Sequence, residues 1–553
     1  MPSKFRNNIL VGLAAAFLFI PFLGAAHLFD WDEINFAESA REMIVSRNYL
    51  LVQINYLPFW EKPPLFIWMQ VLSMKIFGIN EFAARFPNAV CGIVTLLVLF
   101  NFGSRLINNR FGFIWALAFA GSLLPHFYFK SGIIDPWFNL FTFLGIYYFI
   151  LFQRKKHQNA GDAHAWRELA LSAVFIGLAI LTKGPVALLI FVLCIIVYWI
   201  TTGFKSLVNV RQFSLYGLII LIVGGSWFLA LIGNGNAALI KEFVNYQIRL
   251  FTTSDAGHGG SFFYHWIVLL FGCFPMSVLA LQSFKRNNID APAERYFRRW
   301  MLIMFWVVLI LFSIVKTKIV HYSSLCYFPL SFLSAYAMVR LMDGKLAWSR
   351  LIGTVVMFIA AILGILISSL PIIDHYKDKI IRANFIRDKF AVESLKTNVA
   401  WSGFEWLIGI GLIIGTAWML LLIRKNKITH ALIGLFLVTL VTANVSITMI
   451  VPRIEQYSQA AAIRFYETLK GIDCYVTTLR FKSYAQLFYQ AKKPPGNMNS
   501  YNTDWLLSGP IDKPAFFVCK VDKVDAIHGE FPQLMELYRQ NGFVFFVRQP
   551  SPP

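Results

Sequence analysis

Residues 9–38 read ILVGLAAAFLFIPFLGAAHLFDWDEINFAE, an apolar run that is followed after Asp30 and Trp31 by the acidic pair Asp32 and Glu33. An uncharged stretch of about 20 residues is typical of a membrane-spanning helix. The run lacks a clear small-x-small cleavage site, so we expect a retained first span and not a removed signal peptide. Ionisable side chains at the edge of hydrocarbon are costly to desolvate, and they usually have a charged partner or a function.

The composition of the whole chain indicates a protein with many spans. Of its 553 residues, 57% are hydrophobic and only 14% are charged, which excludes the ordinary soluble globular classes. The net charge is +21, but the positive residues are scattered through short loops between apolar runs. This distribution indicates membrane topology and contact with membrane lipids, and it argues against nucleic acid as a partner.

The charge pattern also decides which apolar segments cross. Residues 64–79 are short, open with two prolines and carry Lys75, so we expect them to lie at the interface. With this segment left out and the N-terminus cytoplasmic, dense basic clusters such as Arg154-Lys155-Lys156 and Arg424-Lys425-Asn426-Lys427 all fall on the cytoplasmic side. The pattern predicts an all-α polytopic membrane protein with about 13 transmembrane helices.

The chain changes character after residue 451. Residues 473–479, 515–521 and 543–547 are predicted strands, and helices are predicted at 481–491 and after Phe531. We therefore predict a transmembrane domain, 1–451, whose first outer loop, 29–64, carries the active site. A small extracytoplasmic α/β domain, 452–553, follows. Cys474 and Cys519 lie in this second domain, and the sequence leaves open whether they form a disulfide.

The unusual charges gather on the predicted outer face. Asp32 is a candidate general base for an acceptor hydroxyl, although an acid at this position could also cap the next helix. Glu61 and Lys62 precede two prolines that hold the backbone extended. Lys62 is expected to meet a lipid-borne phosphate, while Glu61 orients it, contacts the sugar or binds a divalent cation. The alternative is a snorkelling lysine with a local salt bridge.

Other candidates lie at the outer ends of later spans. Asp135 either caps its helix ahead of Pro136 or provides a second carboxylate, and the two roles are compatible. Lys183 either snorkels or meets the donor phosphate. His258 lies among glycines, which suggests a loop able to close over a substrate, although a lone loop histidine is more often solvated. Arg249 suits bidentate recognition of a phosphate. Lys318, His321 and Tyr322 add cations and a phenol at the outer end of another span, where an interfacial anchor is the alternative. The residues expected to contact the substrate are Glu33, Glu61, His258 and Lys318.

Familiar nucleotide and metal motifs are missing from the sequence. It contains no GxxxxGK[ST], no GxGxxG after a strand, no HExxH and no CxxC pair. Nucleotide hydrolysis, a Rossmann cofactor and a thiolate metal site are therefore not expected, and no metal ligands are assigned beyond the candidate cation position near Glu61.

Several strings in this order resemble a known family. The sequence around Asp32 and Glu33, together with Glu61-Lys62-Pro63-Pro64-Leu65 and Leu181-Thr182-Lys183-Gly184-Pro185, resembles the membrane-embedded GT-C glycosyltransferases. Within these it is most similar to the superfamily of protein O-mannosyltransferases and lipid A aminoarabinose transferases. The resemblance covers roughly residues 1–340, and beyond them only the layout of spans and outer domain.

The resemblance implies inverting transfer of a sugar from a polyprenyl-phosphate carrier to a lipid A-like or protein acceptor. The reaction would take place on the periplasmic face of a bacterial inner membrane. By this resemblance Asp32 is the catalytic carboxylate, Asp135 is a second essential acid, and Lys62, Arg249 and Tyr322 hold the carrier phosphate. The sequence departs from the aminoarabinose transferases at Asn35 and Phe36, where they usually carry arginine and tyrosine, so the sugar and the acceptor stay open.

Two other classes are compatible with parts of the pattern. A transporter or flippase of lipid-linked saccharides would use the same charges without transfer chemistry, but its usual paired repeats are not found. A structural assembly factor would leave the membrane-edge carboxylates without a function. The sequence therefore favours the glycosyltransferase.

Overall fold

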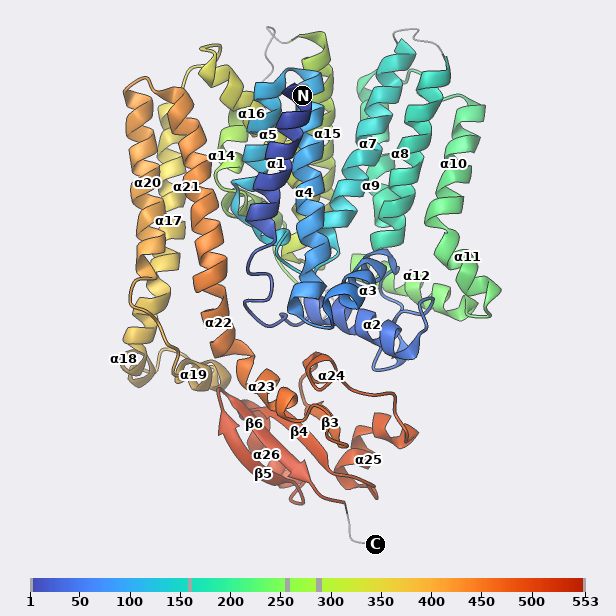
Figure 1. Ribbon diagram of the computed structural model, residues 1–553, viewed down its shortest axis with the longest axis vertical. Helices are drawn as coiled ribbons and strands as arrows, with labels where there is room; N and C mark the ends of the chain where they lie inside the picture. The colour runs from blue at the N-terminus through green and yellow to red at the C-terminus, as the bar shows by residue number, and fades with distance from the viewer. Residues whose placement is uncertain (1–2, 158–161, 254–258, 285–290, 551–553) are drawn as a thin grey trace.

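The computed structural model describes residues 3–157, 162–253, 259–284 and 291–550, and it shows a helical bundle with a small sheet domain at one end (Figure 1). The bundle helices are α1 (Ser3–Phe19), α4 (Glu81–Leu106), α5 (Asn109–Ala120), α6 (Leu123–Tyr128), α7 (Asp135–His157), α8 (Asp162–Lys183), α9 (Val186–Thr201), α10 (Val210–Gly224), α11 (Ser226–Gly233), α13 (Tyr264–Gly272), α14 (Met276–Ala280), α15 (Pro292–Ile314), α16 (Tyr327–Met342), α17 (Arg350–His375), α20 (Trp406–Arg424) and α21 (Ile428–Met449).

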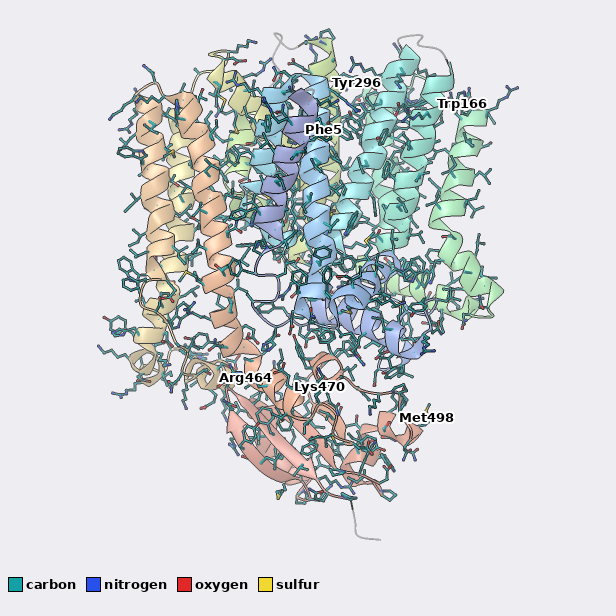
Figure 2. All side chains as sticks on the ribbon, viewed as in Figure 1. Phe5, Trp166, Tyr296, Arg464, Lys470 and Met498 are labelled. Carbon is teal, nitrogen blue, oxygen red and sulfur yellow. The ribbon has the colours of Figure 1, made fainter. Side chains whose placement is uncertain are left out.

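The bundle confirms a polytopic, mostly helical membrane protein. Seven of the described helical segments are long and apolar enough to cross a membrane. The number rises to nine if the bent pairs α10–α11 and α13–α14 each form one span. Side chains fill the space between the helices, and the labelled Phe5 and Tyr296 lie near the end of the bundle opposite Arg464 and Lys470 (Figure 2).

Local sequence explains how neighbouring helices pair. The Asn80 side chain accepts a hydrogen bond from the backbone N–H of Ala83 and caps α4, and Asn108 caps α5 through the N–H of Phe111. Only two residues separate α4 from α5, so the helices run antiparallel. Their close approach requires glycine, because a Cβ on Gly103 would lie 2.8 Å from the Cα of Gly112.

A layer of shorter elements lies between the bundle and the sheet domain (Figure 1). It contains α2 (Asp32–Ser46), the strands β1 (Gln53–Ile54) and β2 (Leu57–Pro58), α3 (Leu65–Phe77), α12 (Ala237–Thr252), α18 (Lys377–Arg382) and α19 (Lys389–Leu395). Helix α3 corresponds to the segment predicted to lie at the interface, and it has 13 residues. The predicted outer loops therefore share one end of the molecule with the C-terminal domain.

The C-terminal domain is a four-stranded mixed sheet with short helices. Its elements are α22 (Val451–Ser458), α23 (Ala460–Thr468), β3 (Tyr475–Leu479), α24 (Ala485–Tyr489), α25 (Thr503–Ser508), β4 (Ala515–Lys520), α26 (Val524–Glu530), β5 (Met535–Gln540) and β6 (Phe543–Arg548). The strand order is β3-β4-β6-β5, with β3 and β4 parallel and the other pairs antiparallel. Phe517, Val544 and Phe545 are fully buried in its core.

One prediction for this domain was wrong. The segment after Phe531 is the strand β5 and not a helix, and α26 ends before it. Asn541 and Gly542 join β5 to β6, and both have positive φ, 51° and 77°. An Asn-Gly pair with this geometry is the usual two-residue hairpin turn, so the turn chemistry overrides the weak helical pattern.

The two cysteines of this domain are free thiols in the structure. Cys474 precedes β3, whereas Cys519 pairs with Leu479 at the other end of that strand. At about 3.3 Å per residue along a strand, this separation is too long for a disulfide.

Candidate active site

Asp32 is the first residue of α2 and follows the irregular segment 20–31 that leaves α1. The helix has no side-chain cap at its N-terminus. Its start is held by the neighbouring Glu33, which forms a buried ion pair with Arg85 at 2.8 Å. Glu33 also accepts hydrogen bonds from the backbone N–H groups of Phe29 and Gly132. Asp32 itself is left 39% exposed at the side chain and available to a ligand.

Asp135 is the first residue of α7, and the turn before it is fixed from inside the bundle. The side-chain amide of Asn88 donates to the backbone carbonyls of Ser131 and Ile133, each at 2.6 Å. Lys183, the last residue of α8, donates from Nζ to Asp135 Oδ1 at 2.6 Å. Since α7 and α8 are antiparallel neighbours, the first residue of one meets the last residue of the other. The buried carboxylate is therefore paired with a cation.

His321 brings the two carboxylates into one site. Its Nε2 lies 3.4 Å from Asp32 Oδ2 and 3.8 Å from Asp135 Oδ2. The imidazole thus stands between an exposed acid and a buried one. This arrangement fixes the relative position of three titratable groups from three different helical segments, which is the usual construction of a catalytic centre.

Cations and aromatic rings border the same site. Lys62 Nζ lies 5.1 Å from the centre of the Tyr246 ring, and the Tyr246 hydroxyl donates to Glu61 Oε2 at 2.9 Å. Lys183 Nζ lies 5.0 Å from the centre of the Tyr322 ring. Burial lowers the pKa of Lys62, with the neighbouring Glu61 opposing the shift. A partly desolvated ammonium of this kind binds an anion more strongly than one in bulk water.

Two cavities meet at these cations. The first is lined by Asp32, Asn35, Glu61, Asp135 and His321 among others. The second is mostly apolar, with Val186, Leu189, Phe312 and Val315 in its lining. Both are lined by Lys62, Lys183, Leu250 and Tyr322. A polar chamber and an apolar one therefore share a border that carries two lysines.

Three predicted contacts lie outside the polar cavity. Glu33 is occupied by Arg85 and the backbone, as described above. Lys318 is buried, and its Nζ donates to the carbonyls of Phe312, Ser313 and Val315 at the C-terminal end of α15. Arg249 is exposed, and its guanidinium lies 5.1 Å from the centre of the Tyr246 ring. His258 falls outside the described residues.

Two residues of the site received no role in the prediction. They are His321, which lies at the outer end of a later apolar run, and Tyr246. Tyr246 could have been found from the spacing of Phe243, Tyr246 and Leu250, which places the three on one face of α12. Glu61 contacts Tyr246, and among the described residues no group of three or more His, Cys, Asp or Glu side chains could hold a metal ion.

Comparison with known proteins places this geometry in context. Residues 61–229 match the family described as dolichyl-phosphate-mannose-protein mannosyltransferase. Undecaprenyl phosphate-alpha-4-amino-4-deoxy-L-arabinose arabinosyl transferase from Shewanella sediminis is 27% identical over 354 residues, 62% of each chain. A second such transferase, from Proteus mirabilis, is 27% identical over 393 residues, 67% of each chain. The match thus spans about three fifths of the Shewanella protein.

Solved structures share the fold over nearly the whole chain. ArnT from Cupriavidus metallidurans bound to undecaprenyl phosphate has a TM-score of 0.75 at 20% identity, covering 98% of this chain and 99% of that one. The Archaeoglobus fulgidus oligosaccharyltransferase has a TM-score of 0.52 at 11% identity, covering 93% and 70%. The resemblance predicted from the sequence is confirmed: the chain is a membrane protein that shares the fold of ArnT and is similar in sequence to the mannosyltransferase family and to the aminoarabinose transferases.

Proposed function

We propose that the protein is an inverting glycosyltransferase that moves a sugar from a polyprenyl phosphate to an acceptor hydroxyl at the outer face of the membrane. The observation that carries the proposal is the position of His321, within 4 Å of both Asp32 and Asp135. This acidic centre adjoins the lysine-bearing border of an apolar cavity. The names of the similar proteins support the same donor class.

Different parts of the donor would occupy the two cavities. The prenyl tail fits the apolar cavity, the phosphate meets Lys62 and Lys183 at the border, and the sugar enters the chamber that holds the carboxylates. Ammonium groups in a poorly hydrated site stabilise the negative charge that develops on the leaving phosphate. Tyr322 lines both cavities and stands beside Lys183, so it completes the phosphate position.

The two acids have different roles. Asp135 is buried and neutralised by Lys183, which suits an anchor that orients the cation. Asp32 is exposed and takes the proton from the acceptor hydroxyl as its oxygen bonds to the anomeric carbon. The bond from that carbon to the phosphate oxygen breaks, and its electron pair leaves with the phosphate. A single displacement inverts the anomeric configuration.

The finer topology belongs to this proposal. Helices α1, α5, α7 and α9 lie in the same bundle as the nine candidate spans (Figure 1), and counting them gives the 13 spans predicted from the sequence. We place the boundary between the membrane domain and the C-terminal domain at residues 451 and 452, at the start of α22. The acidic centre and the C-terminal domain then face the periplasm of a bacterial inner membrane.

A transfer assay tests the proposal. Purified protein in lipid nanodiscs is given undecaprenyl-phosphate sugars, beginning with 4-amino-4-deoxy-L-arabinose, and lipid A or a protein acceptor. Wild type is expected to release undecaprenyl phosphate, and Asp32→Asn to lower kcat by about 10²–10⁴-fold while it still binds donor. Absence of transfer with every donor, or full turnover by Asp32→Asn, would overturn the assignment.

A further inference from the structure

The segment that precedes Asp32 lacks regular structure of its own. Residues 20–31 form neither helix nor strand, and Trp31, at the N-cap of α2, makes no side-chain cap bond. The position of the Asp32 carboxylate therefore depends on what holds these residues, in addition to the Glu33–Arg85 pair that holds the first turn of α2. Two sets of contacts do so, one from each domain.

The membrane domain holds the first part of the segment. The Arg85 guanidinium donates to the carbonyls of Leu23, Ala26 and His27 at 2.7–2.9 Å. Lys130 donates to the carbonyl of Pro21 at 2.8 Å. These contacts account for the path of the chain up to His27.

The C-terminal domain holds the last part, next to Asp32. The Tyr489 hydroxyl accepts a hydrogen bond from the Leu28 N–H at 2.7 Å. The Gln459 side chain donates to the Leu28 carbonyl at 2.8 Å and accepts from the Asp30 N–H at 3.4 Å. One amide group thus bridges two backbone positions, as a neighbouring strand would.

Side chains extend this contact to the residue before Asp32. The Tyr484 ring meets the Trp31 ring edge to face, with centres 6.1 Å apart. Lys482 Nζ lies 5.1 Å from the Trp31 ring centre and 5.4 Å from that of Tyr484. His27 Nδ1 lies 3.0 Å from Glu455 Oε1, at the other end of the same stretch. Leu28, Asp30 and Trp31 therefore each contact the C-terminal domain, while Arg85 and Glu33 hold the His27 carbonyl and the Phe29 N–H from the membrane domain.

We propose that the C-terminal domain positions the catalytic carboxylate, with Gln459 and Tyr489 as positioning residues. This inference rests on the proposed function of Asp32. Misplacing a reacting group by about 1 Å can cost on the order of 10²-fold in rate. Loss of these contacts lets Asp32 leave its place opposite the anomeric carbon, while the donor position at Lys62 and Lys183 stays intact because it lies in the membrane domain.

The test compares matched variants of the full-length protein. Gln459→Ala and Tyr489→Phe remove bonds to residues 28–30. Tyr501→Phe is the first control. It removes a hydrogen bond between the C-terminal domain and the first outer loop, from the Tyr501 hydroxyl to the Asn55 carbonyl at 2.9 Å, at a position away from Asp32. Gln533→Ala removes the hydrogen bond that the Gln533 side-chain amide donates to the Leu507 carbonyl within the C-terminal domain.

The first two variants are expected to lower kcat about fivefold or more, with donor KM changed less than twofold, whereas the two controls keep kcat within twofold. Hydrogen exchange at residues 27–33 should be faster in Gln459→Ala and Tyr489→Phe than in Tyr501→Phe. This readout needs no turnover, so it separates failure of the inference from failure of the proposed function. Equal loss of kcat in Tyr489→Phe and Tyr501→Phe, or unchanged exchange at these residues, would overturn the proposal.

Discussion

The Oε1 atom of Glu33 accepts a hydrogen bond from the backbone nitrogen of Gly132 at 2.5 Å, which joins the first turn of α2 to the turn that leads into α7. Asp32 and Asp135 begin these two helices. Burial would raise the pKa of Glu33, but Arg85 and the backbone N–H groups outweigh it and hold that pKa below its ordinary value. The ionised Glu33 carboxylate thus fixes the position of Asp32 relative to Asp135.

We predict that Glu33→Gln destabilises the fold and lowers turnover together. The substitution leaves Arg85 charged and buried without its partner, at a cost of about 3–5 kcal/mol. Thermal unfolding of the protein in detergent measures this loss. Glu393→Gln is the control because its pair with Lys396 lies on the surface, where we expect a change below about 1 kcal/mol. A melting temperature equal to that of wild type would contradict the role given to Glu33.

Lys318→Met should lower stability without changing donor KM. Its ammonium satisfies three carbonyls at the end of α15, and hydrogen bonds to a charged group are each worth about 1.5–3 kcal/mol. Lys62→Met should do the reverse and raise donor KM more than about tenfold, because a cation is lost at the phosphate. The melting temperature and the donor KM of both variants are measured. A raised donor KM in Lys318→Met would show that Lys318 contacts the donor and would contradict its structural role.

The alkaline side of the pH profile should report Lys62. Only the protonated form attracts phosphate, and burial lowers the pKa of this group. As pH rises, Lys62 loses its charge at a lower pH than an ordinary lysine does. The value of kcat/KM should therefore begin to fall at a pH below the usual lysine pKa of about 10.4. In Lys62→Arg the guanidinium stays charged, and this fall should disappear. Identical profiles in the two proteins would rule out Lys62 as the titrating group.

Asn35 should contribute to sugar recognition and little to stability. It lines the polar cavity, is 7% exposed, and its Oδ1 has no hydrogen-bond partner among the described residues. Asn35→Ala should therefore keep the melting temperature while kcat/KM falls about tenfold, since one hydrogen bond to the donor is lost. Asn88→Ala is the contrast, because that amide bonds two backbone carbonyls and its loss should lower the melting temperature. An unchanged kcat/KM in Asn35→Ala would exclude the contact.

Helix ends explain why much of the site could be predicted. Asp32, Asp135 and Lys183 each begin or end a helix at the same end of the bundle. The basic loops fix which end that is, so topology alone brings these residues together. The Asn-Gly turn between β5 and β6 was also present in the sequence, but its signal was outweighed by a helical pattern.

The parts that could not be predicted depend on partners distant in sequence. Asp32 and Glu33 are neighbours, yet one faces the cavity and the other faces Arg85, 52 residues away. Lys318 looks like any lysine at a membrane edge until the end of α15 is placed beside it. Side-chain direction at such positions is decided by packing, which a single sequence does not contain.

The hydrogen bonds between Leu28 and the C-terminal domain have a consequence for biosynthesis. Tyr489 follows Leu28 by 461 residues and Gln459 follows it by 431. During synthesis, Leu28 is made at least 431 residues ahead of these partners. The centre is therefore completed only after the C-terminal domain has been made and has packed against Leu28, and a chain that ended before Gln459 would form the two cavities without these contacts beside Asp32.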